Sequence, residues 1–316
     1  MTFTFDAATV RESLDLGKLI EVVEQLHIEL AAGRAVQPPR LPLAVPDSRA
    51  VIIPMLAAST VSDIVCFKLL IDNPDNDRGR QRSTIVAMKI DTGECVATLQ
   101  GAVVTQLRTA AASAVATRAL ARPDARVLGL VGAGAQARSH LRAIAAVRDL
   151  GEVVVWNRTP ENAEWLVDEA ASLGLPCTIV PEVRAVVEAS DIVCTLTPSR
   201  EPIVRGDWLR PGQHLNVVGS PPRPDHREID SEVLRRSTVV VDALDVALAE
   251  SGAVVQAIAD GAISAGDLRL ELGHVLLDRP FERMPGQITV FTSVGLPIQD
   301  LAAVTALLAS TEHPAR

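Results

Sequence analysis

Three cations early in the chain have the residue types and positions of a carboxylate-binding site. Arg40 follows a double proline, Lys68 lies within the apolar run 64–70, and Arg108 lies at the start of an alanine-rich helix. A lysine in such a run must pair with an anion, extend its head group to water, or face a cleft. Arginine binds a carboxylate through two parallel hydrogen bonds. Each cation alone is also typical of an ordinary surface, but their combined placement predicts a site for a carboxylate.

A second constellation is a glycine-rich turn in the middle of the chain. Residues 125–131 are mostly apolar, as in a buried parallel strand, and G-x-G-x-x-A follows at 132–137. Small residues at this spacing let the backbone approach a pyrophosphate at a helix N-terminus. A helical segment over 136–144 and a strand over 152–156 complete the βαβ unit that the motif requires. The turn predicts a dinucleotide site, although such a turn also occurs with nothing bound.

The end of the second strand of this unit indicates which dinucleotide is preferred. Sites that prefer NAD carry a carboxylate there, whereas this strand ends in Asn157, Arg158 and Thr159. Arg158 can pair with a 2′-phosphate, and a surface arginine near a turn is the alternative. We therefore expect NADP(H) to be preferred, with NAD(H) possible. The residues expected to contact the dinucleotide are Gly132, Gly134, Ala135, Gln136, Asn157, Arg158, Thr159, Thr195, Thr109 and Val218.

The elements that position these residues differ between the two parts of the chain. Before the glycine turn, a helical pattern over 6–32, broken near Gly17, precedes strands that are largely antiparallel, which is an α+β arrangement. A helix over 106–122 then bridges to the second part. There, strands and helices alternate for about 120 residues, which is typical of a Rossmann doubly wound parallel sheet. We predict an α/β protein with such a sheet plus an α+β domain.

Composition and charge exclude several classes of function. A net charge of −9, 3% aromatic residues and no tyrosine argue against a nucleic-acid binder. The four cysteines show no CxxC spacing and the six histidines no ligand spacing, so no metal site is expected. No apolar run approaches the ~18 residues of a membrane helix, and the first residues lack a signal pattern. We expect a cytoplasmic protein whose 48% hydrophobic residues cover a subunit interface as well as a core.

Together these motifs resemble the ornithine cyclodeaminase/mu-crystallin family over nearly the whole chain. The segment 156–159 is most similar to the NADPH-using ketimine reductase branch of that family. The matching segments are 37–40, 67–69 with 73–74, 101–113, 131–137, 156–159, 223–228, 271–273 and 293–300.

The resemblance implies a homodimer in which one domain binds the substrate and the other binds the dinucleotide. The last helix in such proteins returns to the first domain. The substrate-binding and dimerisation domain would therefore comprise 1–121 and 296–316, and the Rossmann domain 122–295. By resemblance, Arg40, Lys68 and Arg108 hold the substrate carboxylate, and Lys68 and Arg108 take part in catalysis.

The chain departs from the cyclodeaminase pattern at two positions. Where cyclodeaminases carry acids, this chain has Ile53 and, in a loop that looks one residue longer, Ser220 and Pro221. Cyclodeamination needs a base for the amine and a group that steers ammonia loss, so losing both acids argues against it. Asp225 and His226 are candidates for a displaced acid/base pair, or are surface residues of the loop.

Three functions follow, from different classes. The first is an NAD(P)H-dependent reductase of a cyclic ketimine acid, of the pyrroline- or piperideine-2-carboxylate type, or its reverse, an amino-acid dehydrogenase. In such a reductase the nicotinamide carries the hydride and the protein positions the C=N carbon beside it. The second is ornithine cyclodeaminase, forming proline and ammonia with bound NAD. The third is a small-ligand binding protein of the mu-crystallin kind.

Overall fold

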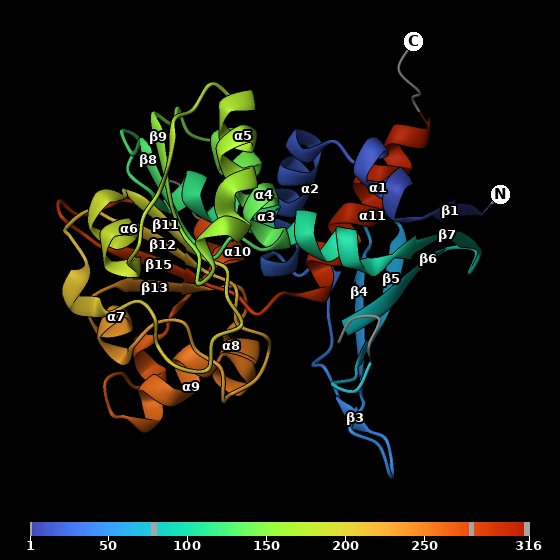
Figure 1. Ribbon diagram of the computed structural model, residues 1–316. Coiled ribbons are helices and arrows are strands. Elements are labelled where there is room, and N and C mark those ends of the chain that lie inside the picture. The colour runs from blue at the N-terminus through green and yellow to red at the C-terminus, as the bar shows by residue number, and fades with distance from the viewer. Residues whose placement is uncertain (1, 77–80, 278–280, 313–316) are drawn as a thin grey trace. The chain divides into compact units, whose positions relative to one another are not determined.

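The computed structural model describes residues 2–76, 81–277 and 281–312, and the chain divides into two compact units (Figure 1). The first unit comprises Met1–Arg108 and Leu296–Arg316, and the second comprises Thr109–Gly295. The division lies inside helix α3 (Gly101–Leu120), whereas the sequence placed it at the end of that helix. The α/β class with a Rossmann-like parallel sheet and a second, mixed sheet is confirmed. Among the described residues, no helix combines the length and apolarity that crossing a membrane requires.

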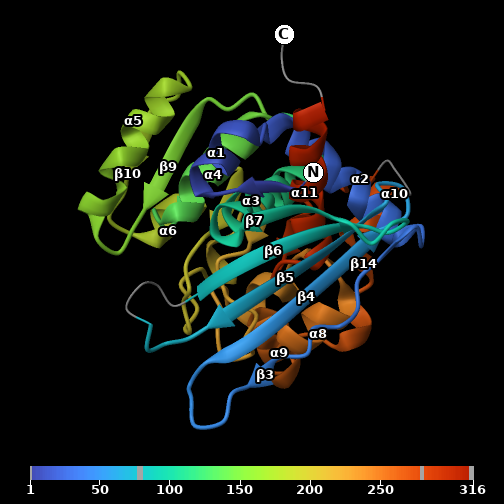
Figure 2. The same ribbon diagram turned by 90° about the vertical axis from the view of Figure 1, so that its right-hand side faces the viewer.

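The first unit is a mixed sheet covered by helices (Figure 2). Its strand order is β1-β7-β6-β5-β4-β2, with β3 also paired to β4. Strand β1 runs parallel to β7 and the other pairs are antiparallel. Besides the start of α3, its elements are β1 (Phe3–Phe5), α1 (Ala7–Ser13), α2 (Leu16–Ala31), β2 (Ala35–Val36), β3 (Leu43–Ala44), β4 (Val51–Ser59), β5 (Ile64–Asp72), β6 (Gln81–Lys89), β7 (Cys95–Gln100) and α11 (Pro297–Glu312).

The helical stretch at the N-terminus is divided into two helices at Asp15, which is the N-cap of α2. The Asp15 carboxylate accepts a hydrogen bond from the Lys18 backbone N–H at 2.6 Å, which begins α2 at Leu16. The break that the sequence predicted near Gly17 lies at Leu14 and Asp15, and Gly17 itself lies inside the first turn of α2. An aspartate at this position satisfies an N–H that the helix itself leaves unpaired, so the chain ends one helix and starts another.

Strand β5 presents two faces of different character. Cys66 and Lys68 are buried, whereas Phe67, Leu69 and Ile71 between and beyond them are 39%, 38% and 43% exposed. This alternation follows from the period of two in a strand. Helix α11 packs on β4 and β5 and also contacts α2, so the buried face is the one under these helices (Figure 2). Lys68 therefore points into the unit, and three apolar side chains remain on the open face.

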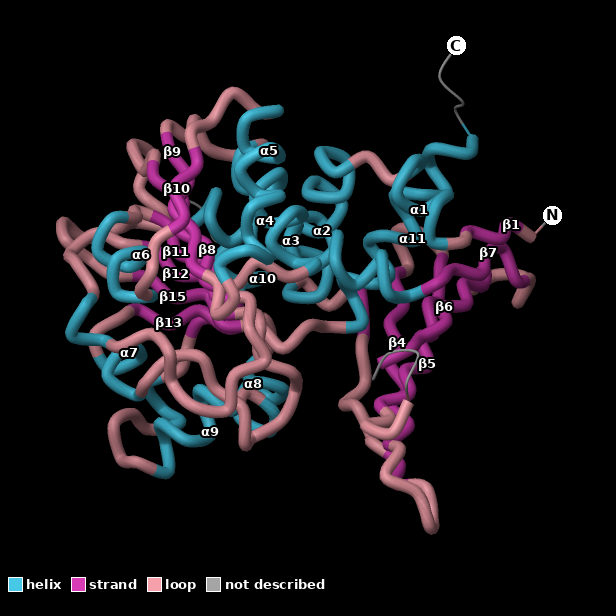
Figure 3. Tube along the Cα trace, in the orientation of Figure 1, coloured by secondary structure: helices cyan, strands magenta, loops and turns pink. Residues whose placement is uncertain are grey.

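The second unit is an eight-stranded parallel sheet, drawn in magenta in Figure 3. Its strand order is β10-β9-β8-β11-β12-β15-β13-β14, so the C-terminal ends of all strands meet at one edge. Besides the end of α3 and three short 3₁₀ turns, its elements are β8 (Val127–Val131), α4 (Ala135–Ala145), β9 (Glu152–Trp156), α5 (Glu164–Ser172), β10 (Cys177–Ile179), α6 (Val183–Ala189), β11 (Ile192–Thr195), β12 (His214–Val217), α7 (Ser231–Arg235), β13 (Thr238–Val241), α8 (Leu244–Glu250), α9 (Gly252–Ala259), β14 (Leu270–Glu271), α10 (Leu272–Leu277) and β15 (Thr289–Thr292).

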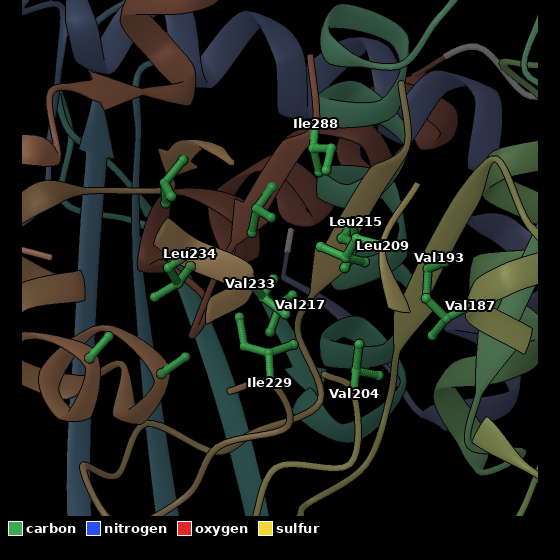
Figure 4. Packing of buried hydrophobic residues seen from close by; sticks show 14 of the residues in the cluster. Val187, Val193, Val204, Leu209, Leu215, Val217, Ile229, Val233, Leu234 and Ile288 are labelled. Carbon is green, nitrogen blue, oxygen red and sulfur yellow. The ribbon is translucent and has the colours of Figure 1, made fainter. Parts of the chain in front are cut away.

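Helices cover both faces of this sheet, as β12 illustrates. Leu215 and Val217 join a buried apolar cluster that includes residues of α6, α7 and α9 (Figure 4). Asn216, between them, points to the opposite face, where its Nδ2 donates to Thr117 Oγ1 of α3 at 2.9 Å. Most strands of this sheet are rich in apolar residues because both of their faces are buried, which is why they were readable from the sequence.

Candidate active site

Lys68 is the centre of a buried polar cluster in the first unit. Its side chain is 3% exposed, and its ammonium donates to Thr105 Oγ1 at 2.7 Å and to both Asp300 oxygens at 3.2 and 3.3 Å. Burial lowers the pKa of the Lys68 ammonium; the Asp300 carboxylate opposes this change and the Arg108 guanidinium adds to it. The lysine that the sequence singled out is thus held by an anion from the far end of the chain.

Asp300 also connects Lys68 to Arg108. Arg108 Nε lies 3.5 Å from Asp300 Oδ1, and both side chains are nearly inaccessible to solvent. We call Lys68, Arg108 and Asp300 the basic cluster. Lys68 and Arg108 thus share one carboxylate in a water-poor environment, where charged groups need close partners. Two neighbouring buried cations are a donor set that suits a carboxylate ligand.

A second layer of contacts orients Arg108. Gln299 Oε1 accepts from Arg108 Nη1 at 2.7 Å, and Gln299 Nε2 lies 3.3 Å from Nε2 of His27 on α2. Burial lowers the pKa of His27 to about 4, so its ring is neutral at pH 7 and accepts this hydrogen bond. Gln299 is fully buried, as is its neighbour Asp300. The guanidinium is thereby held from two sides by consecutive residues of α11.

The start of α11 explains why a carboxylate is stable at position 300. The helix begins at Pro297, after Gly295 in a left-handed conformation with φ of 82°. Proline suits the first turn of a helix and glycine suits the positive φ before it. Asp300 lies in the first turn, where the unpaired N–H groups of the helix favour negative charge.

Of the three cations predicted from the sequence, the structure joins Lys68 and Arg108 through Asp300. Arg40 belongs to the same unit and is 9% exposed, in the segment between β2 and β3. Sequence reasoning missed Thr105, Gln299 and Asp300. The signal for the last two was present, since they are polar residues within the otherwise apolar start of a helix.

The second unit holds a cavity of about 360 Å³ at the C-terminal edge of its sheet. Its wall comes from the glycine turn, the end of β9 and the segment after β11. Its lining residues are Gly132, Ala133, Gly134, Trp156, Asn157, Arg158, Thr159, Asn162, Leu196, Thr197, Pro198, Ser199 and Ile203. We call it the dinucleotide pocket, because ligands of open parallel sheets bind at this edge.

The glycine turn has the geometry that a dinucleotide requires. Gly132 has φ of 107°, and a Cβ there would lie 2.9 Å from Thr197 Cγ2 and 3.2 Å from the Leu196 carbonyl oxygen. Gly134 is the N-cap of α4 and gives no side-chain cap, while a Cβ there would meet nothing within 4 Å. The N-terminus of α4 is thus left open toward the pocket, and its free N–H groups suit a pyrophosphate.

Asn157 and Arg158 have different roles in this wall. Asn157 Oδ1 accepts from the Ala133 N–H at 3.0 Å, and its Nδ2 donates to the Thr159 carbonyl at 2.7 Å. Asn157 therefore ties the glycine turn to the end of β9. Arg158 is exposed at the pocket wall, beside Thr159, with its guanidinium accessible to an anionic ligand.

The other residues expected to contact the dinucleotide lie outside the pocket's lining. Ala135 and Gln136 form the first turn of α4. Thr195 is buried at the end of β11, Val218 follows β12 and Thr109 is a buried residue of α3. The residues after β11 that line the pocket, including Thr197 and Ser199, were missed. They could have been found, because the ends of all strands of a parallel sheet share one edge.

Asp225 and His226 do form a pair. His226 Nδ1 lies 2.9 Å from Asp225 Oδ1, with the imidazole buried and the carboxylate 61% exposed. Ser220, which stands where cyclodeaminases carry an acid, lies in the same loop between β12 and α7. Over the described part of the chain, no three His, Cys, Asp or Glu side chains gather in a way that could hold a metal ion.

Comparison with known proteins gives one family. The model of the ornithine cyclodeaminase/mu-crystallin family matches residues 2–313. Ketimine reductase mu-crystallin of Rattus norvegicus is 34% identical over 274 residues, which cover 86% of this chain and 84% of that protein.

Two solved structures share the fold over almost the full length. Delta(1)-pyrroline-2-carboxylate reductase of Thermococcus litoralis, in complex with NADH and L-proline, gives a TM-score of 0.92 at 32% identity, covering 99% of this chain and 98% of that one. An archaeal alanine dehydrogenase, a dimer with bound NAD, gives a TM-score of 0.91 at 27% identity, covering 99% and 97%.

Proposed function

The chain belongs to the ornithine cyclodeaminase/mu-crystallin family as an NAD(P)-dependent oxidoreductase acting on C=N bonds, and we propose that it reduces a cyclic ketimine acid. The proposed substrates are of the pyrroline- or piperideine-2-carboxylate type, and the reverse reaction is an amino-acid dehydrogenation. The observation that carries the proposal is the basic cluster itself, in which two buried cations lie around one carboxylate and provide the donors that a substrate carboxylate needs.

The proposed roles of the residues follow from their contacts. Arg108 and Lys68 bind the carboxylate, together with Arg40. Thr105 and Asp300 hold the Lys68 ammonium in place, so that Lys68 can also pass a proton toward the product amine. The nicotinamide supplies the hydride when it is bound. Accordingly we assign the first unit to substrate binding and dimerisation, and the second to dinucleotide binding.

A direct assay tests the reaction. The protein is incubated with NADPH and Δ1-pyrroline-2-carboxylate or Δ1-piperideine-2-carboxylate while oxidation of the dinucleotide is followed, and separately with ornithine without external reductant. Consumption of NADPH with formation of the cyclic amino acid supports the proposal. Ammonia and proline from ornithine would establish a cyclodeaminase, and ligand binding without turnover would establish a binding protein. Either result would overturn the proposed reductase.

A preference for NADPH is the second part of the proposal. It is supported by Arg158 at the end of β9 and by Asn157 in place of the carboxylate that holds ribose hydroxyls in NAD-preferring sites. We expect Arg158→Ala to raise KM for NADPH by about tenfold or more and to leave KM for NADH nearly unchanged. The control is Arg138→Ala, since Arg138 lies on α4 and pairs with Glu169. Equal KM values for NADPH in the variant and the unmodified protein would contradict the preference.

The third part is a homodimer formed through the open face of the mixed sheet. Six apolar residues on β4, β5 and β6 and just after β6 are 37–45% exposed: Leu56, Phe67, Leu69, Ile71, Met88 and Ile90. A contiguous apolar face of this kind is typical of an interface. We expect light scattering to show a dimer and Leu69→Glu to shift it to the monomer, whereas Val167→Glu, on α5, leaves it intact. A monomeric protein would contradict this part.

A further inference from the structure

Glu228 is a fully buried carboxylate beside the dinucleotide pocket. It lies in the loop between β12 and α7 and is 0% exposed. Its backbone carbonyl accepts from the N–H groups of Ile203 and Val204 at 2.8 and 2.9 Å, so the residue itself is anchored. A carboxylate is rarely buried unless charges or hydrogen bonds compensate its lost hydration.

Four donors supply that compensation, and they come from two strand ends. Oε1 accepts from the backbone N–H of Thr197 at 2.6 Å and from its hydroxyl at 2.9 Å. Oε2 accepts from the hydroxyl of Thr195 at 2.8 Å and from the backbone N–H of Gly219 at 2.8 Å. The carboxylate thus binds the segment after β11 to the segment after β12.

The segment after β11 forms one wall of the dinucleotide pocket. Thr197 lines the pocket, and it is also the residue that Gly132 of the glycine turn approaches most closely. Gly219 has no room for a side chain either, because a Cβ there would lie 2.1 Å from the Thr197 nitrogen and 2.6 Å from Glu228 Oε1. Thr197 therefore contacts the glycine turn on one side and the Glu228 carboxylate on the other.

We propose that Glu228 is a positioning residue that fixes this pocket wall by holding the amides of Thr197 and Gly219 on its two separate oxygens. The proposal rests on the assignment of the pocket to a dinucleotide made above. The ionised carboxylate accepts from all four donors, whereas a protonated carboxyl carries a hydrogen atom that a neighbouring group must turn to accept. The threonine hydroxyls can rotate to accept, but the two amides cannot.

The ionisation of Glu228 falls in the physiological range. Burial raises the pKa of its carboxyl to about 7, and the hydrogen bonds from Thr197, Thr195 and Gly219 oppose the increase. Other titratable residues of this region are the Cys194 thiol of β11, whose pKa burial raises to about 12, and Asp225, His226 and Arg227 of the same loop. Cys194 stays neutral, Arg227 pairs with Asp260, and the Asp225–His226 contact is a separate pair. When the pH falls through 7, the Glu228 carboxylate that holds the pocket wall therefore binds a proton.

The test compares Glu228→Gln with Glu188→Gln. A glutamine at 228 has one oxygen, so whichever way its amide is turned, its NH₂ faces a backbone N–H. Glu188 undergoes the same chemical change on the exposed side of α6, where it pairs with Arg184. The dissociation constants of NADPH and NADH are measured by fluorescence titration without substrate, and folding is checked by circular dichroism and thermal unfolding.

We expect E228Q to bind both dinucleotides about tenfold or more weakly and E188Q to bind them within about twofold of the unmodified protein. A folded E228Q that binds as tightly as E188Q overturns the positioning role. If the unmodified protein binds neither dinucleotide, the assignment of the pocket fails instead, so the two failures are distinguishable.

A second measurement does not depend on the variant being stable. The NADH dissociation constant of the unmodified protein is followed from pH 8 to pH 6. NADH is used because the 2′-phosphate of NADPH itself titrates at about pH 6. We expect the affinity to fall severalfold through pH 7, and the profile of E228Q to be flat where that variant folds. An affinity of the unmodified protein that does not change over this range overturns the role.

Discussion

At the scale of single residues, Asp300 sets the charge balance of the basic cluster. Its carboxylate is shared by the Lys68 ammonium and the Arg108 guanidinium, and all three side chains are at most 6% exposed. The pair Lys68–Asp300 joins residues separated by 232 positions. The sequence identified the two cations because each is a charged residue within a segment of mostly apolar residues. It could not identify their counter-ion, since the pairing depends on where the last helix packs.

The importance of this carboxylate can be measured by Asp300→Asn. The substitution keeps the shape but removes the negative charge that the buried Lys68 and Arg108 share, so we expect the free energy of unfolding to fall by about 3–5 kcal/mol at pH 7. The loss should shrink at higher pH, because Lys68, whose pKa burial already lowers, can then give up its proton. Chemical denaturation measures both effects.

The matched control is Asp124→Asn. Asp124 pairs with Arg122 at 3.2 Å but is 75% exposed, so its loss should change stability by less than about 1 kcal/mol. Equal stability losses in the two variants would show that the basic cluster is hydrated and that its charge balance is unimportant.

At the scale of elements, the helices and strands of the second unit were predictable and several boundaries were not. The strands are buried on both faces, so their apolar runs were plain in the sequence. Helix α3, however, begins at Gly101 and not near 106, directly at the end of β7. A Cβ at Gly101 would lie 2.0 Å from Ser83 Oγ, so this glycine serves a close approach between elements and not a break in a helix. The helix propensities of neighbouring residues do not reveal such a contact between distant segments, so the start of α3 could not be predicted from them.

The turn between β8 and α4 gives a prediction at this scale. In Gly132→Ala, a side chain is forced into a positive φ and against Thr197, so we expect dinucleotide affinity to fall by at least about tenfold. Gly261→Ala is the matched control. Gly261 also has a positive φ, of 71°, but a Cβ there would meet nothing within 4 Å. It should cost about 1 kcal/mol of stability and leave binding unchanged. Affinities are compared by fluorescence titration, and unaltered binding by the Gly132 variant would contradict the pocket's assignment.

At the scale of the whole molecule, stability depends on histidines buried in their neutral form. Burial lowers the pKa values of His27 and His140 to about 4 and that of His214 to about 3. His140 lies 2.9 Å from the Gln136 carbonyl oxygen through Nδ1 and 3.0 Å from Ser113 Oγ through Nε2, an arrangement that suits the neutral ring. None of these three was a candidate for chemistry in the sequence, and the structure gives them a structural role.

The pH dependence of unfolding follows from these histidines. Between pH 6.5 and 4 the unfolded chain binds more protons than the native protein, so stability falls as the pH falls. Each histidine contributes up to about 1.4 kcal/mol per pH unit in this range. Glu228 acts with the opposite sign, because its raised pKa makes the native state bind more protons between pH 4.5 and 7, but one group opposes three.

Denaturation at pH 7 and pH 5 measures this slope. In His140→Gln the slope should decrease by about one proton. A stability that is constant or rises from pH 7 to pH 5 would contradict the neutral burial of these rings.

Strand β5 has a consequence for how this chain can vary through evolution. Lys68 and the apolar residues of the open face alternate on one strand, so either set can be exchanged residue by residue without disturbing the other. Inserting or deleting a single residue between Ile64 and Lys68 would instead turn the lysine outward and bring Phe67 or Leu69 inside. A substitution on one face of β5 therefore leaves the other face in place, whereas a change in the length of the strand exchanges the two faces.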